Sequence, residues 1–146
     1  MKFNWNQNVE NKFIDENQNR LLKIGFSIER DIKLSMQEKG SGKVYWKGKY
    51  RDIMHQASAA GETPAVDTGR LRASITTAWP GGRSQGGKDA IESPPKEFRR
   101  FVVRVGTNVE YGVYLELGTS KLAPRPFLRP ALERHREELA NMGREK

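Results

Sequence analysis

The chain has 146 residues, a length that fits one domain with a modest hydrophobic core. Hydrophobic residues make up 36% and charged residues 30%, so the chain either folds around a small core or buries surface against copies of itself. It has no cysteine, which excludes disulfides and thiolate metal sites, and it has no apolar run long enough to span a membrane. Its net charge of +8 indicates either contact with a polyanion or simply a well-solvated basic surface.

The first predicted element is one long helix from Val9 to Glu38. From Leu21 onward its apolar residues recur every three or four positions, which keeps them on one face: Leu21, Ile24, Ile28, Ile32 and Met36. Gly40 and Gly42 favour a helix end, because glycine readily takes the left-handed cap conformation. At about 1.5 Å per residue the helix would span roughly 45 Å. We therefore expect it to cross a sheet and to extend toward a neighbouring subunit.

Short elements follow the helix. The segment Lys43–Arg51, with the sequence KVYWKGKYR, predicts a hairpin or an extended stretch that turns near Gly48. Its alternating basic and aromatic residues would either cover one edge of the core, which is the interpretation we adopt, or stack on nucleic acid. Asp52–Ala60 predicts a short helix. Asp67 is predicted as the N-cap of one helical turn, since its carboxylate can accept backbone N–H groups.

Two strands are predicted next, Ser74–Trp79 and Phe98–Gly106, and we expect them to pair as a hairpin. Residues 80–97 between them are rich in glycine and proline and would bury too little apolar surface to offset their ordering entropy. They are predicted to form a flexible loop. If this loop faces a channel, the side chains that would meet passing DNA are Arg83, Lys88 and Lys96.

The last third of the chain predicts two helices. Glu110–Leu117 forms a short one that stops at Gly118, although a strand is the alternative for this segment. Phe127–Met142 forms the last one, with Pro130 in its first turn, where a missing N–H has no consequence. The predicted fold class is α+β in a single domain, 1–146: a long N-terminal helix packed on a small antiparallel sheet, with a short helix and a C-terminal helix.

The sequence contains no recognisable catalytic motif. The two histidines, His55 and His135, lie far apart and there is no cysteine, so no zinc-ligand spacing exists. The paired glycines lack the spacing of a phosphate-binding loop. Scattered carboxylates can in principle form a nuclease-type metal site, but they are far more often surface charges: Asp67, Asp89, Glu92, Glu110 and Glu116. We predict no enzyme, no cofactor and no metal site.

Three stretches carry a family resemblance: Ala57–Ile75 (ASAAGETPAVDTGRLRASI), Val105–Thr119 (VGTNVEYGVYLELGT) and Ala123–Leu132 (APRPFLRPAL). In this order and spacing they resemble the tail-component family of long-tailed bacteriophages, the head–tail joining, neck or tail-completion proteins. Three positions depart from that pattern. Ala60 and Thr63 stand where proline is frequent, and Leu117 stands where phenylalanine is common. These changes alter a loop and its packing and remove no chemical group.

The resemblance implies a structural virion protein that forms a ring at the head–tail junction or tail end during assembly, without catalysis. The partners it implies are further copies of the chain, expected as a hexamer for a tail of sixfold symmetry, the head connector or stopper, and the tail tube or tail terminator. Nonspecific contact with phage DNA is expected, and no membrane. The location it implies is the neck or tail of the virion, and the host cytoplasm during assembly. The alternative function is a small basic nucleic-acid-binding protein.

A set of residues is expected at the subunit interface. Aromatic side chains offer large apolar area with little loss of entropy, and prolines pre-order an extended arm over Thr119–Arg129. Glu116 is expected to form charge pairs with nearby arginines. Plain core packing remains the alternative for the tyrosines, and a solvated carboxylate the alternative for Glu116. The expected interface residues are Tyr111, Tyr114, Glu116, Thr119, Arg125, Pro126, Phe127 and Arg129.

Overall fold

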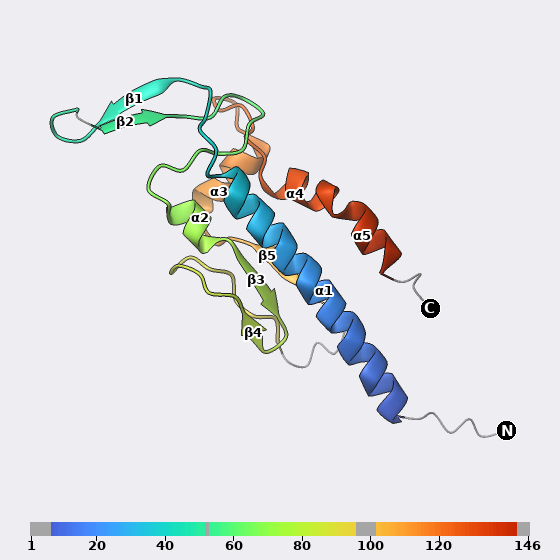
Figure 1. Cartoon of the computed structure of the whole chain (residues 1–146). Helices are drawn as coiled ribbons and strands as arrows, with labels where there is room; N and C mark the ends of the chain where they lie inside the picture. The colour runs from blue at the N-terminus through green and yellow to red at the C-terminus, as the bar shows by residue number, and fades with distance from the viewer. Residues whose placement is uncertain (1–6, 52, 96–101, 143–146) are drawn as a thin grey trace.

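The computed structural model describes residues 7–51, 53–95 and 102–142, with side chains from residue 11 onward (Figure 1). Its helices are α1 (Gln7–Ser35), α2 (Arg70–Ser74), α3 (Glu110–Leu117), α4 (Leu128–Arg134) and α5 (Arg136–Asn141). Its strands are β1 (Val44–Lys47), β2 (Ile53–Gln56), β3 (Thr76–Trp79), β4 (Gly82–Arg83) and β5 (Arg104–Gly106). The long N-terminal helix, the small antiparallel sheet and the further short helices confirm the predicted α+β fold.

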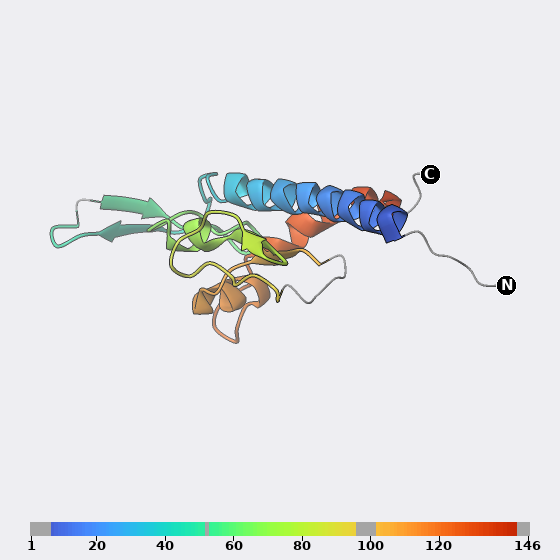
Figure 2. The same cartoon turned by 90° about the horizontal axis from the view of Figure 1, so that it is seen from below.

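Helix α1 forms one wall of the core. It crosses the β3–β5 layer and runs beside α4 and α5, and its first turns extend past the sheet (Figures 1 and 2). The predicted apolar stripe is confirmed from its second member onward, since Ile24, Ile28, Ile32 and Met36 are all at most 7% exposed. Other elements complete the core with Leu71, Ile75, Val109, Phe127 and Ala131. One apolar helix face therefore organises the whole domain.

The three-stranded sheet has the order β4-β3-β5, with both pairs antiparallel. The predicted pairing of the two strand segments is confirmed for their central part, with Thr76 opposite Gly106 and Ala78 opposite Arg104. The strands are shorter than predicted, since Ser74 belongs to α2 and Val102 and Val103 lie in no strand. The residues from Phe98 to Phe101 lie outside the described part of the chain. On the other edge Ala78 faces Arg83 of β4, so the sheet continues into the segment predicted to be a loop.

The segment between the two main strands is more ordered than its composition predicts. Gly82 and Arg83 form β4, and Ala90 and Pro94 are buried. The Ile91 backbone N–H donates to Thr76 Oγ1 at 3.2 Å. The expectation that residues 82–94 have no structure of their own is therefore wrong. Hydrogen bonds of backbone and hydroxyl groups order the segment, although it contains few apolar side chains. Its flexibility stays a prediction, and residues 96–97 lie outside the described residues.

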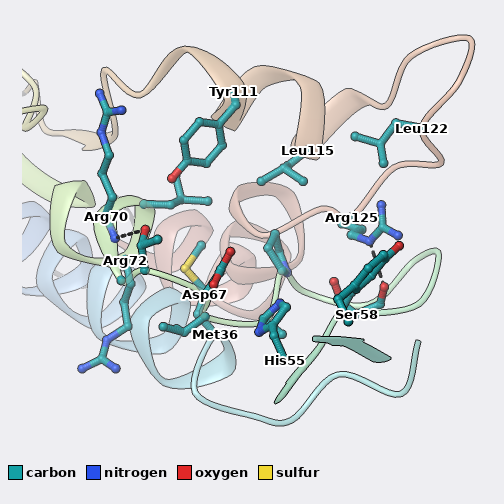
Figure 3. A pocket seen from close by; sticks show the side chains of 18 residues that line it. Met36, His55, Ser58, Asp67, Arg70, Arg72, Tyr111, Leu115, Leu122 and Arg125 are labelled. Carbon is teal, nitrogen blue, oxygen red and sulfur yellow. Dashed lines mark hydrogen bonds between the residues drawn. The ribbon is translucent and has the colours of Figure 1, made fainter. Parts of the chain in front are cut away.

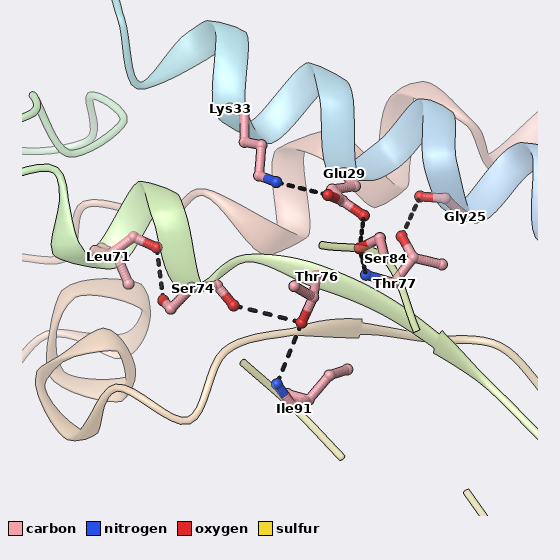
Figure 4. A network of polar contacts seen from close by, with 9 residues as sticks. All are labelled: Gly25, Glu29, Lys33, Leu71, Ser74, Thr76, Thr77, Ser84 and Ile91. Carbon is pink, nitrogen blue, oxygen red and sulfur yellow. Dashed lines mark hydrogen bonds and ion pairs between the residues drawn. The ribbon is translucent and has the colours of Figure 1, made fainter. Parts of the chain in front are cut away.

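A buried carboxylate ties α1 to this segment (Figure 4). Glu29 is 7% exposed, and its carboxylate accepts hydrogen bonds from Lys33 Nζ at 2.6 Å and from Ser84 Oγ at 2.7 Å. Burial alone would raise the pKa of Glu29, but the hydrogen bonds from Lys33, Thr77 and Ser84 outweigh it and lower that pKa. Thr77 Oγ1 also donates to the Gly25 carbonyl at 3.1 Å. These bonds hold the start of the segment against α1.

The predicted helix over Asp52–Ala60 is wrong. Ile53–Gln56 form β2 instead, paired antiparallel with β1. The turn between the strands contains Gly48 (φ 86°) and Arg51 (φ 54°), and such left-handed residues reverse the chain. Pairing with a partner strand decides the conformation of β2, and a local helix preference carries no information about that partner.

Asp67 does not cap a helix. The residue preceding α2 is Gly69 with φ 76°, and the first N–H of the helix, that of Arg70, donates to Thr68 Oγ1 at 3.4 Å. The Asp67 carboxylate instead forms an ion pair with Lys47 of the first hairpin strand. A glycine replaces the expected cap because the chain enters α2 through a left-handed conformation, which glycine adopts without steric strain.

The predicted C-terminal helix is divided in two at His135. The backbone there has φ −100° and ψ 6°, outside the α-helical range, so α4 ends and α5 begins again. The His135 ring lies between two carboxylates, with Nε2 at 2.9 Å from Asp31 of α1 and Nδ1 at 3.0 Å from Glu138 of α5. The guanidinium of Arg134 also approaches Asp31, at 3.9 Å. The break thus orients a histidine that fastens α5 to α1.

This arrangement predicts pH-dependent stability. Hydrogen bonds to Glu138 and to Asp31 raise the pKa of His135 above its usual 6.5, against the opposing effect of burial. The resulting stabilisation is complete below the unfolded pKa and is lost as pH rises through the higher folded pKa. We therefore expect His135→Ala to destabilise the protein more at about pH 5.5 than at about pH 8.5 in urea unfolding. Asp31→Asn should reduce that difference, and an equal loss at both pH values would contradict the prediction.

Candidate assembly surface

The β1–β2 hairpin projects from the body of the molecule (Figures 1 and 2). Its register places Tyr45 opposite His55 and Trp46 opposite Met54. Large side chains on it are strongly exposed, with Trp46 at 59%, Met54 at 61% and Tyr50 at 80%. A two-stranded hairpin is at best marginally stable alone in water, so these side chains would gain from a covering surface. The expectation that the aromatic residues cover the edge of the chain's own core is wrong for Trp46 and Tyr50.

The two faces of the hairpin differ. Directly opposed residues of an antiparallel pair share a face, and successive residues alternate between faces. Tyr45 and His55 line a cleft at the base of the hairpin. The opposite face, which we call the outer face, consists of Val44, Trp46, Met54 and Gln56. None of these four carries a charge, and the three apolar ones are 42%, 59% and 61% exposed in that order. The outer face is therefore an open apolar surface.

Basic side chains lie around the hairpin and not on its outer face. Lys43 precedes β1, and Lys49 and Arg51 occupy the turn. The ammonium of Lys43 lies 5.5 Å from the ring centre of Tyr45, and that of Lys49 lies 5.6 Å from the ring centre of Tyr50. Cations over aromatic rings stabilise the arrangement modestly at exposed sites. The outer face is thus uncharged, while basic side chains lie over Tyr45 on the opposite face and at the turn of the same hairpin.

Helix α3 carries a second open apolar surface. Val113, Tyr114 and Leu117 are 51%, 54% and 61% exposed. Positions three and four apart lie on one side of a helix, so these three form a continuous row, which we call the α3 stripe, with Glu110 at its start. The buried side of α3 contains Gly112. The expected interface residue Tyr114 therefore lies on an exposed surface, and Leu117 and Val113, which sequence reasoning did not assign to the interface, lie beside it.

A cleft of about 460 Å³ opens between the base of the hairpin, α2 and α3 (Figure 3). Apolar side chains of Met36, Leu71 and Leu115 contribute to its lining, with Tyr111 and three arginines around them. Arg70 is already paired with Asp89, at 2.8 and 2.9 Å, and Arg125 Nε donates to the Ser58 carbonyl at 3.0 Å. Because these two guanidinium groups serve the fold, the cleft is a poor candidate for an anion site.

Glu116 has a role that the sequence did not indicate. Its carboxylate accepts three backbone hydrogen bonds at the start of α4, from the N–H groups of Phe127 at 2.7 Å, Leu128 at 2.9 Å and Arg129 at 3.0 Å. A helix start leaves such N–H groups without intrahelical partners, and a carboxylate there is favoured by the helix dipole. The expected charge pairs with Arg125 and Arg129 are replaced by this capping contact among the described residues.

The predicted arm over Thr119–Arg129 folds back onto its own chain. Thr119 Oγ1 accepts from the Leu122 N–H at 3.0 Å, and the Arg125 N–H donates to the Leu115 carbonyl at 2.7 Å. Pro126 is half-buried and Arg129 is exposed. Phe127 is 1% exposed and belongs to the core. The expectation that Phe127 anchors a subunit interface is therefore wrong, because the capped start of α4 directs its ring inward.

The residues expected to face DNA are Arg83, Lys88 and Lys96, of which the structure describes the first two. Arg83 is exposed, and its Nη1 donates to the Ile91 carbonyl at 3.2 Å, so the side chain folds back along its own segment. Lys88 is exposed and lies next to Asp89 in the sequence. Lys96 lies outside the described residues. A channel-facing role for this segment stays a prediction.

Within residues 11–51, 53–95 and 102–142, no group of three or more His, Asp and Glu side chains is placed so that it could hold a metal ion. In the same part of the chain no helix has the length and apolar character needed to cross a membrane. A comparison with protein-family models, with curated proteins and with solved structures finds no match for this chain.

Proposed function

We propose that this chain is a structural virion protein of a long-tailed bacteriophage that forms a ring at the head–tail junction or tail end. The observation that carries the proposal is the pair of open apolar surfaces, the outer face of the hairpin and the α3 stripe, on a domain with a small core. Soluble monomers rarely expose contiguous apolar surface of this kind unless it contacts a partner. The resemblance of three stretches of sequence to phage neck and tail-completion proteins supports the same proposal.

A ring follows from this type of surface by a simple geometric argument. Two different surfaces on one subunit can join head to tail, and such contacts close into a ring when the rotation between subunits permits it. A hexamer matches a tail of sixfold symmetry. The ring would lie between the head connector or stopper and the tail tube or tail terminator, in the neck or tail of the virion. The ring would join the head to the tail structurally and would catalyse no reaction.

The proposal is tested by assembly. The purified chain should co-purify with the head connector and the tail tube proteins of its own phage, and electron microscopy should show it as a ring at the neck or tail end. Particles assembled without this chain should accumulate as separate heads and tails. Normal joining of heads to tails in its absence would refute the proposal, as would a catalytic activity that maps to a defined site in the chain.

A small nucleic-acid-binding protein is the second candidate, favoured by the basic and aromatic residues around the hairpin turn. Binding of this type neutralises phosphates, so its affinity would fall steeply as salt rises. The uncharged outer face of the hairpin argues against phosphate contact on that side. We expect only weak DNA binding, and Lys49→Glu with Arg51→Glu should abolish it in a filter or anisotropy assay without changing co-purification with tail proteins. Tight DNA binding with no association with tail proteins would favour the alternative.

A further inference from the structure

We infer that the outer face of the hairpin of one copy packs against the α3 stripe of a second copy. This inference rests on the proposed ring and names the two surfaces that would join its subunits. It commits to a second copy of this chain as the occupant of both surfaces. Three properties of the molecule support it, namely the match between the surfaces, their separation within one chain, and their charges.

The two surfaces are complementary halves of a common packing unit. Domains are built from layers in which an apolar helix stripe covers an apolar sheet face. The hairpin provides a sheet face with Val44, Trp46 and Met54, and α3 provides a helix stripe with Val113, Tyr114 and Leu117, all more than 40% exposed. Within the described residues, neither surface is covered by a second layer. Trp and Tyr are also the residues most enriched at the energetically dominant positions of protein interfaces.

One chain cannot bring its own two surfaces together. The hairpin extends to one side of the molecule, whereas α3 lies below the sheet layer (Figure 2). The cleft at the hairpin base, lined by Tyr45 and His55 on one side and by Tyr111 and Leu115 of α3 on the other, separates them. The face of the hairpin that looks into this cleft is the one with Tyr45 and His55, so the outer face turns away from the chain's own α3. A contact between the two surfaces therefore requires a second copy, and it is a head-to-tail contact.

The charges around the two surfaces have opposite signs. The hairpin carries Lys49 and Arg51 in its turn, and Lys43 directly before β1. Helix α3 has no basic residue, carries Glu110 at the start of its stripe, and ends at Leu117, where the negative end of the helix dipole favours a nearby cation. Such complementarity orients two surfaces and disfavours wrong partners. It also disfavours two hairpins meeting turn to turn, because their basic turns would repel. Nucleic acid would find no cation on the α3 stripe.

Disulfide trapping tests the inference directly, because the natural chain has no cysteine. Met54→Cys and Tyr114→Cys would be made in separate chains that carry tags of different mass, and their fold checked by circular dichroism. Mixed and oxidised, they should give the crosslinked heterodimer in about tenfold higher yield than Met54→Cys mixed with Ser93→Cys, since docking raises the effective concentration of the two thiols. Ser93 is an exposed residue that belongs to neither surface and serves as the matched control.

Three results would overturn the inference. The first is a yield for the test pair equal to that of the control pair. The second is preferential dimerisation of Met54→Cys with itself, which would show that two hairpins pair with each other. The third is protection of Met54→Cys from oxidation by added duplex DNA, which would assign the outer face to nucleic acid. If the chain still co-purifies with tail proteins in any of these cases, the proposed function stands and only the named interface fails.

Discussion

Replacing Phe127 with alanine is expected to lower the free energy of unfolding by about 3–5 kcal/mol, measured by urea denaturation. Phe127 is the largest of the fully buried side chains described, at 1% exposure, and it belongs to the core cluster with residues of α1 such as Ile28 and Ile32. Its ring also lies close to Gly112 on the buried side of α3. Truncation would leave a cavity where α1, α3 and α4 meet. Since a domain of this size is stable by roughly 5–15 kcal/mol, the loss would be a large share of the total.

Tyr114→Ala is the matched control for this change. It also removes an aromatic ring from the second half of the chain, but the ring is 54% exposed. Its effect on unfolding should stay within about 0.5 kcal/mol, as for most surface substitutions. The two variants should therefore separate folding from assembly, with Phe127→Ala affecting the first and Tyr114→Ala the second. An unchanged unfolding curve for Phe127→Ala, combined with weaker assembly, would mean that Phe127 is an interface anchor after all.

The elements with strong local signals could be predicted from the sequence. The four-residue spacing of Ile24, Ile28 and Ile32 identifies α1 and its buried face, because a helix places such positions on one side whatever surrounds it. The short helix at Glu110–Leu117 is predicted for the same reason, and Gly118 ends it as expected. Alternation in the strand containing Arg104 and Val105 identifies β5. In each case the residues that decide the structure lie within one or two turns of one another.

The hairpin shows why other parts could not be predicted. Residues Ile53–Gln56 form a strand because they pair with β1, and the sequence of β2 alone does not predict which segment it pairs with. When β2 is interpreted as a helix, the cross-strand partners of Trp46 cannot be identified, and its aromatic neighbours are assigned to the edge of the core. The outer face depends on the pairing of Trp46 with Met54 and is therefore missed. Composition indicates the charge of this region correctly but not which of its faces is apolar.

Glu116 illustrates the same limit in the candidate site. Its partners, the N–H groups of Phe127 to Arg129, lie eleven to thirteen residues further along the chain. Capping motifs recognisable in sequence place the acidic residue within three positions of the helix start. The loop that folds back through Thr119 and Leu122 brings the carboxylate to α4, and no local sequence pattern predicts the course of this loop. The nearby arginines in the sequence suggest ion pairs because charge is the only visible property.

The second large effect is expected at this carboxylate. Glu116→Ala would leave three N–H groups at the start of α4 without their acceptor and would remove a negative charge from the positive end of the helix dipole. Hydrogen bonds to charged groups are individually stronger than neutral ones, so we expect a loss of about 2–3 kcal/mol in the free energy of unfolding. Chemical denaturation would measure it, and hydrogen exchange should show faster exchange at Phe127, Leu128 and Arg129 in particular.

Glu116→Gln keeps the size of the side chain but removes its negative charge, so it separates the contribution of the charge from that of the hydrogen-bond geometry. The amide oxygen can still accept the N–H groups of Phe127 and Leu128, which share Oε2 in the natural protein, but its NH₂ group is a donor and meets the Arg129 N–H donor at the other position. The variant should therefore be intermediate between the natural protein and Glu116→Ala. Glu92→Ala, which removes an exposed carboxylate from a loop, should change stability by less than about 0.5 kcal/mol. If Glu116→Ala behaved like Glu92→Ala, the carboxylate would not hold α4, and the alternative of a solvated surface group would be correct. If Glu116→Ala lowered the free energy of unfolding by more than the expected value of about 2–3 kcal/mol, the capping contact would also help to hold Phe127 in the core, since both lie at the start of α4.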